Sequence, residues 1–121
     1  MKQITALLFI LTLLVAGCSH KMAPTAAKAY QGDLLVSFNS AGSGINHKAL
    51  DKFKTYLDEY NTKADPKITY QIKAAGREGE KDVCIQSNGN KHFGELVQHI
   101  TDMLKGENLV SIMEHQDCSK K

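Results

Sequence analysis

The sequence lacks a strong charge of either sign, internal repeats and low-complexity segments. Its 121 residues hold 15 Lys and Arg against 13 Asp and Glu. The formal net charge of +2 is too small to indicate a nucleic-acid-binding protein. The charged fraction of 23% excludes a generally disordered chain and a coiled coil. A chain of this length forms one compact domain at most.

A hydrophobic run long enough to span a membrane is also missing. After Lys2, apolar residues dominate from Ile4 to Ala16, about 13 residues or roughly 20 Å as a helix. A bilayer core of roughly 30 Å needs about 20 apolar residues, so this segment is too short for a permanent span. A positive start, an apolar middle and a small-residue end are typical of a secretory signal peptide.

The end of this segment carries a more specific motif. Leu14 precedes Val15-Ala16-Gly17-Cys18, which resembles the lipobox of bacterial lipoproteins. The resemblance implies that Cys18 receives a diacylglycerol thioether and that residues 1–17 are removed as a signal peptide. The α-amino group of Cys18, which this cleavage exposes, would then be acylated, for example with palmitate. Two or three fatty chains attach a protein stably to membrane lipid, whereas one holds it only marginally.

The residue after the lipobox cysteine bears on location. In enterobacterial lipoproteins an aspartate at this position favours the inner membrane, and Ser19 stands there in this chain. The resemblance therefore implies a lipid-anchored protein of the cell envelope, facing the periplasm from the outer membrane rather than the inner one. Residues 18–32 are small and polar, contain Pro24 and lack periodicity, so they are expected to form the lipidated cysteine and a flexible tether.

Residues 33–121 are expected to form a small α+β domain with a C-terminal tail. Alternating apolar residues predict strands over residues 34–38, 68–74, 83–85 and 109–113. Three- and four-residue apolar spacing predicts helices from Asn46, the expected N-cap, to about Tyr60, and over residues 93–104. The order predicts a ferredoxin-like βαββαβ two-layer sandwich, with a four-stranded antiparallel sheet and two helices on one face. Right-handed crossovers favour the strand order fourth, first, third, second.

With Cys18 assigned to lipid, Cys84 and Cys118 remain, and in an exported protein they are expected to form a disulfide. Free thiols, or a bond to a partner, are the alternatives. Alternation puts Cys84 near the start of the third strand, on the sheet face away from the helices. A tail over residues 114–117 would have to fold back across that face to bring Cys118 to it.

Other candidate sites have simpler explanations. Gly42-Ser43-Gly44 lacks the third glycine of a dinucleotide-binding loop, because His47 stands at that position, so a turn is favoured over an anion site. The histidines show no i, i+4 pair, and the sequence has no Cys-x-x-Cys, so solvent-facing histidines, no metal and no cofactor are expected. The five histidines of the sequence are His20, His47, His92, His99 and His115. A reduced tail from His115 to Cys118 would offer a soft-metal chelate.

The segment from Arg77 to Asp82 is rich in both charges and is either a solvated hairpin or a partner contact. Together with the open sheet face it gives a possible partner surface: Arg77, Glu78, Glu80, Lys73 and Gln86. No nucleophile, base and acid share a recognisable spacing, so no catalytic residue is predicted. The expected function is a non-enzymatic, membrane-anchored interaction module with a protein partner in the envelope. The alternative is a thiol- or metal-dependent periplasmic protein that uses Cys84, Cys118 and nearby histidines.

Overall fold

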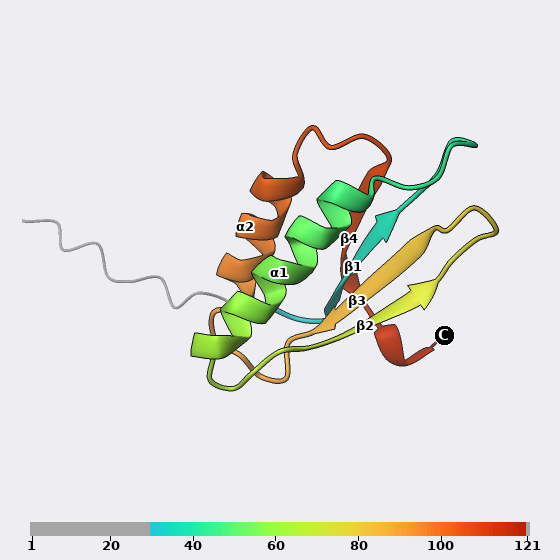
Figure 1. The fold of residues 1–121 in the computed structure, drawn as a ribbon. Helices are drawn as coiled ribbons and strands as arrows, with labels where there is room; N and C mark the ends of the chain where they lie inside the picture. The colour runs from blue at the N-terminus through green and yellow to red at the C-terminus, as the bar shows by residue number, and fades with distance from the viewer. Residues whose placement is uncertain (1–29, 121) are drawn as a thin grey trace, which may run out of the picture.

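A computed structural model describes residues 30–120 of the chain (Figure 1). The expected signal peptide, the lipobox with Cys18, His20 and most of the expected tether lie outside these residues. The elements are the strands β1 (Asp33–Phe38), β2 (Thr69–Ala74), β3 (Lys81–Gln86) and β4 (Val110–Gln116), the helices α1 (His47–Lys63) and α2 (Phe93–Leu104), and a 3-10 helix η1 (Cys118–Lys120).

The described chain folds into two layers. Four antiparallel strands lie in the order β2-β3-β1-β4, and both helices cover one face of the sheet (Figure 1). The sequence of elements and the strand order are those expected from the sequence, so the ferredoxin-like βαββαβ arrangement is confirmed.

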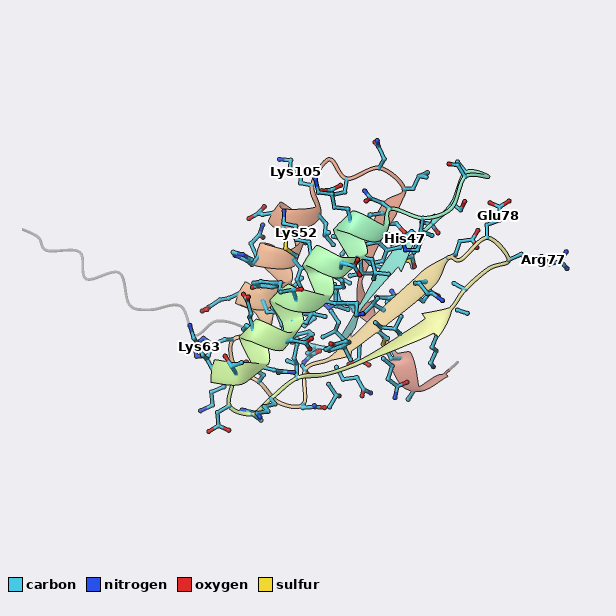
Figure 2. All side chains as sticks on the ribbon, viewed as in Figure 1. His47, Lys52, Lys63, Arg77, Glu78 and Lys105 are labelled. Carbon is cyan, nitrogen blue, oxygen red and sulfur yellow. A yellow bond between two sulfur atoms is a disulfide. The ribbon has the colours of Figure 1, made fainter. Side chains whose placement is uncertain are left out.

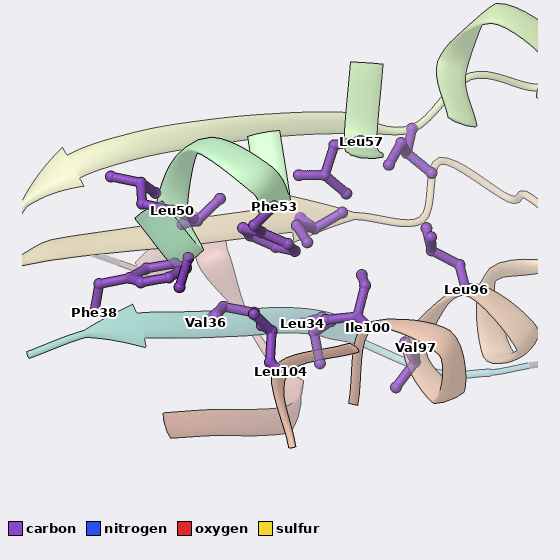
Figure 3. Close-up of a cluster of buried hydrophobic side chains, with 14 of the residues drawn as sticks. Leu34, Val36, Phe38, Leu50, Phe53, Leu57, Leu96, Val97, Ile100 and Leu104 are labelled. Atoms are coloured by element: carbon purple, nitrogen blue, oxygen red, sulfur yellow. The ribbon is translucent and has the colours of Figure 1, made fainter. Parts of the chain in front are cut away.

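The core lies between the two layers (Figure 3). Alternate residues of β1, Leu34, Val36 and Phe38, point into it, and Phe53 of α1 and Ile100 of α2 meet them from the helices. All five side chains are completely buried. Apolar residues recur at every second position in the strands and at every third or fourth position in the helices. This spacing determines which face of each element is covered.

Helix α1 begins as expected and ends one turn later than expected. The side chain of Asn46 caps it by accepting a hydrogen bond of 3.0 Å from the Ala49 N–H. Beyond Tyr60 the helix continues to Lys63. Asn61, in this last turn, donates to the Ile68 carbonyl and accepts from the Ile68 N–H, both at 3.0 Å. This double hydrogen bond joins the end of the helix to the residue before β2.

Strand β4 differs from its expected bounds. It runs to Gln116 instead of ending at Met113, because a register shift opposite Asp33 and Leu35 lets polar residues continue the pairing with β1. His115, inside the shifted part, has a φ of 58°. Residues 114–116 therefore lie in the sheet and not in the expected fold-back, whereas Cys118 does reach the open face, since the chain turns there after Gln116.

Residues 30–32, the part of the expected tether that the structure describes, pack against the domain. The Tyr30 ring meets Phe93 edge-on at 5.1 Å between centroids and stacks on His115 at 4.8 Å. Gly32 has a φ of 92°, and a Cβ built on it would lie 2.9 Å from the His115 Cα. The close approach of the two backbones requires glycine at this position.

Candidate functional site

A disulfide joins Cys84 of β3 to Cys118 of η1, with 6.1 Å between the Cα atoms, and this confirms the expected pairing. Cys84 is the fourth of the six residues of β3, so the expectation that it lies near the start of the strand is wrong. The bond holds η1 against the open face of the sheet. Leu35 of β1 also belongs to that face by alternation, yet it is only 7% exposed. It lines a small space together with Gln116 and Cys118, so the tail covers this part of the sheet.

A shallow cavity of about 250 Å³ lies beside the disulfide. It is lined by Gln71, Lys73, Cys84, Gln86, Cys118 and Ser119. Two residues of the expected partner surface, Lys73 and Gln86, therefore share one hollow on the sheet face. Its volume is below the roughly 300–1,000 Å³ usual for pockets that enclose a small ligand, and it is open and polar.

Sequence reasoning missed Asp33, which lies next to the cysteine pair. Its carboxylate accepts a hydrogen bond of 3.1 Å from the Cys118 N–H. One ligand atom from each of Asp33, Cys84 and Cys118 lies within 4.8 Å of the others, and no histidine between residues 30 and 120 joins this group. Alternation along β1 gave the only available signal, since Asp33, Leu35 and Ser37 share the open face.

The histidines that the structure describes are spread over the surface. His47 is exposed at the start of α1. His92 lies 3.3 Å from the Glu95 carboxylate, and His99 stacks on Tyr56 at 4.9 Å between centroids. The Nδ1–H of His115 donates a hydrogen bond of 2.6 Å to the Gln31 carbonyl, and the ring stacks on Tyr30. Each of the last three has a local partner of its own.

The loop from Asn39 to Gly44 uses two of its glycine amides in hydrogen bonds within the loop itself. The Ser40 hydroxyl accepts hydrogen bonds from the N–H groups of Gly42 and Gly44, both at 3.1 Å. The same hydroxyl donates to the Glu78 carboxylate at 2.8 Å. The amides of Gly42 and Gly44 are thus satisfied within the loop, in keeping with a turn, and the loop is bonded to the tip of the β2–β3 hairpin.

Three residues of the expected partner surface lie together on this hairpin, at its tip and just before β3. Arg77 and Glu78 are exposed there (Figure 2). Glu80 is half-buried, and its carboxylate accepts a hydrogen bond of 2.9 Å from the Glu78 N–H. Glu80 therefore shapes the turn, while Arg77 and Glu78 present their charges to solvent.

The tyrosines link helices to other elements. The Tyr70 hydroxyl on β2 donates to the Asp58 carboxylate of α1 at 2.5 Å, and this bond raises the pKa of Tyr70 to about 12. Burial raises the pKa of Tyr30, Tyr56 and Tyr60 above the ordinary value. The hydroxyls of Tyr30 and Tyr60 donate hydrogen bonds to the side chains of Glu114 and Asn90.

Within residues 30–120, neither helix combines the length and the apolar character needed to cross a membrane. Comparison with protein-family models, with curated proteins and with solved structures finds no match for this chain. The fold places the described residues in the two-layer α+β class, whose ferredoxin-like members serve many unrelated functions. The fold alone therefore does not identify a function.

Proposed function

We propose that this chain is a lipid-anchored protein of the bacterial cell envelope, facing the periplasm from the outer membrane, and that its domain is a non-enzymatic interaction module. The observation that carries the proposal is the Cys84–Cys118 disulfide. Disulfides persist in oxidising compartments outside the cytoplasm. The pair also accounts for two of the three cysteines, which leaves Cys18, the last residue of the lipobox-like motif, for lipid.

The surroundings of the disulfide support a structural role over thiol catalysis. Reactive thiols are activated by neighbouring cations or helix N-termini, which stabilise the thiolate. Here the carboxylate of Asp33 lies next to both sulfurs, and its negative charge opposes thiolate formation. Cys84 is also only 9% exposed, so an attacking substrate would have little access to it. The bond instead fixes the tail on the sheet.

The partner surface is proposed at the end of the domain opposite residue 30. Strand β1 starts next to Tyr30 and runs toward Phe38, which pairs with Lys81 at the foot of the β2–β3 hairpin (Figure 1). The tip of the hairpin therefore points away from the expected tether. Ser40 holds Glu78 in place and so pre-organises this end for a partner. Lys73 extends the surface from the hairpin onto the sheet face, and Gln86 continues it along β3 to the end of the sheet near Asp33.

Metabolic labelling with a clickable palmitate analogue tests the anchor. The full chain, expressed in a Gram-negative host, is expected to incorporate the label, and Cys18→Ser is expected to abolish it. Cys84→Ser is the matched control, because it removes a cysteine outside the motif and should leave labelling unchanged. Ser19→Asp should move the labelled protein toward the inner membrane. An unlabelled wild-type chain, or label retained by Cys18→Ser, would contradict the anchor.

Site-specific photo-crosslinking in intact cells tests the partner surface. A crosslinking amino acid at Arg77 is expected to give one discrete protein adduct, and the same amino acid at Lys52, on the exposed side of α1, should not (Figure 2). Ser40→Ala, which removes the hydroxyl that holds Glu78, should weaken the adduct from position 77. The same adduct from both positions, or none from position 77, would refute the proposed surface.

A further inference from the structure

We propose that Asp33, Cys84 and Cys118 form a second kind of site when the disulfide is reduced: a site for one thiophilic divalent cation, such as Zn²⁺. Two thiolates and one carboxylate would supply three ligands. The inference goes beyond the anchored interaction module and does not depend on lipidation of Cys18. It rests on how three distant segments of the chain meet on the open sheet face.

The spacing of the three groups suits a metal of this size. Their ligand atoms all lie within 4.8 Å of one another, and the Cα atoms of the two cysteines are 6.1 Å apart. At Zn–S and Zn–O distances of about 2.3 and 2.1 Å, tetrahedral ligands are about 3.6–3.8 Å apart. Opening the disulfide and turning the two cysteine side chains therefore reaches the required separation without moving the strands.

The ligands come from anchored parts of the fold. Asp33 begins β1, Cys84 is in the middle of β3, and these two strands pair directly. Only Asp117 separates Cys118 from β4, and the Cys118 N–H is already bonded to Asp33. The cluster of core side chains between sheet and helices includes neither cysteine. The reduced domain is therefore expected to keep its fold and to hold the three groups near one another.

The chemistry balances with a dithiol as reductant. The dithiol gives two electrons and two protons to the Cys84–Cys118 bond, which opens to two thiols, and the dithiol closes to its own disulfide. Metal binding then releases the two thiol protons to solvent. Without a metal the Asp33 carboxylate opposes the thiolates, whereas a divalent cation is attracted to all three anions. Water would occupy the fourth position, as in open zinc sites.

The donor set also predicts selectivity. Two sulfurs and one carboxylate oxygen suit Zn²⁺, Cd²⁺ and Co²⁺, whereas Mg²⁺ and Ca²⁺ require oxygen ligands in larger number. The proposed site therefore binds soft metals only while Cys84 and Cys118 are reduced. Formation of the disulfide removes both thiolates and with them the site.

Co²⁺ titration tests the proposal. The full chain carrying Cys18→Ser, purified in detergent, leaves Cys84 and Cys118 as the only thiols. After reduction and anaerobic removal of the dithiol, one equivalent of Co²⁺ is expected to bind. The expected spectrum combines tetrahedral ligand-field bands with a sulfur-to-cobalt charge-transfer band of an intensity appropriate to two thiolates. Zn²⁺ should displace the cobalt, a hundredfold excess of Mg²⁺ should not, and the oxidised protein should show no such bands.

Two matched variants separate the role of Asp33 from a general effect on the sheet. Asp33→Asn should weaken cobalt binding by at least ~10-fold, the lower end of what loss of a metal-site partner costs. Asp82→Asn, on the same face of the sheet, should bind like the parent. Far-ultraviolet circular dichroism checks that the reduced protein is folded. Absence of the charge-transfer band, equal affinities of Asp33→Asn and parent, or unfolding on reduction would each overturn the proposal. None of these results bears on the anchor at Cys18.

Discussion

The carboxylate of Asp33 accepts a hydrogen bond of 3.1 Å from the backbone N–H of Cys118, a residue 85 positions later in the chain. The first residue of β1 and the end of the described chain are thereby joined on the open sheet face. The disulfide from Cys118 to Cys84 adds a covalent link to β3. Together the two contacts hold η1 across part of the sheet that would otherwise expose Leu35.

Loss of the disulfide should destabilise the domain without changing its fold. For Cys84→Ala combined with Cys118→Ser, the free energy of unfolding should fall by about 3–4 kcal/mol, because the bond closes a loop with a sequence separation of 34. Urea unfolding followed by circular dichroism measures this change. The wild-type chain in excess dithiol without metal is the control and should show the same loss. A double variant as stable as the oxidised wild type would contradict the structural role of the bond.

Replacement of Gly32 should destabilise the domain more than replacement of Gly42, another glycine with positive φ. Gly32 and Gly42 have φ values of 92° and 97°, but a Cβ on Gly42 would meet nothing within 4 Å. Gly42→Ala should cost about 1–2 kcal/mol from backbone strain alone. Gly32→Ala should cost an additional ~1–3 kcal/mol, because its Cβ would press on the His115 backbone. Equal unfolding free energies for the two variants would show that residues 30–32 do not pack on β4.

The Tyr70–Asp58 hydrogen bond should make stability depend on alkaline pH. The folded-state pKa of Tyr70, about 12, lies above the ordinary value of 10.0, so the folded protein holds the phenolic proton more tightly than the unfolded chain. The bond therefore contributes its full stability below about pH 10, and this contribution is lost as the pH rises through about 12. Asp58→Asn should shift one tyrosine transition toward lower pH in an absorbance titration of tyrosinate. Asp51→Asn, on the same helix, should leave the titration curve unchanged.

A substitution that leaves a cavity at the centre of the core should strongly reduce the stability of the domain. Phe53 is completely buried, and its ring lies 5.8 Å from that of Phe38 between centroids. Phe53→Ala should lower the free energy of unfolding by about 3–5 kcal/mol. Lys52→Ala, one residue earlier on the exposed side of α1, should change it by no more than about 0.5 kcal/mol. Thermal or urea unfolding of both variants checks the difference, and similar losses would contradict the assignment of the helix faces.

Elements with a regular apolar pattern could be predicted from the sequence. Leu34, Val36 and Phe38 alternate, and Asn46 precedes a run of helical period, because each buries one face in the core. The end of β4 could not be predicted this way. Glu114, His115 and Gln116 are polar, and the strand continues only because a register shift lets them pair with β1.

Contacts that depend on tertiary structure could not be predicted from the sequence either. Asn90 reads as part of a polar turn, yet it is buried, donates to the Pro66 carbonyl at 2.7 Å and accepts from the His92 N–H at 2.8 Å. The disulfide pairing followed from the number of cysteines and the expected compartment. The position of Asp33 beside it did not, because it depends on the path of the tail across the sheet.

Intact-mass analysis of the protein extracted from membranes reports on the lipid anchor and the disulfide in one experiment. The sample is alkylated before and after reduction. We expect a chain that begins at Cys18, carries acyl groups, and gains two alkyl groups, on Cys84 and Cys118, only after reduction. An unlipidated chain that retains residues 1–17 would contradict the anchor. Alkylation of Cys84 and Cys118 without reduction would contradict the disulfide-closed domain.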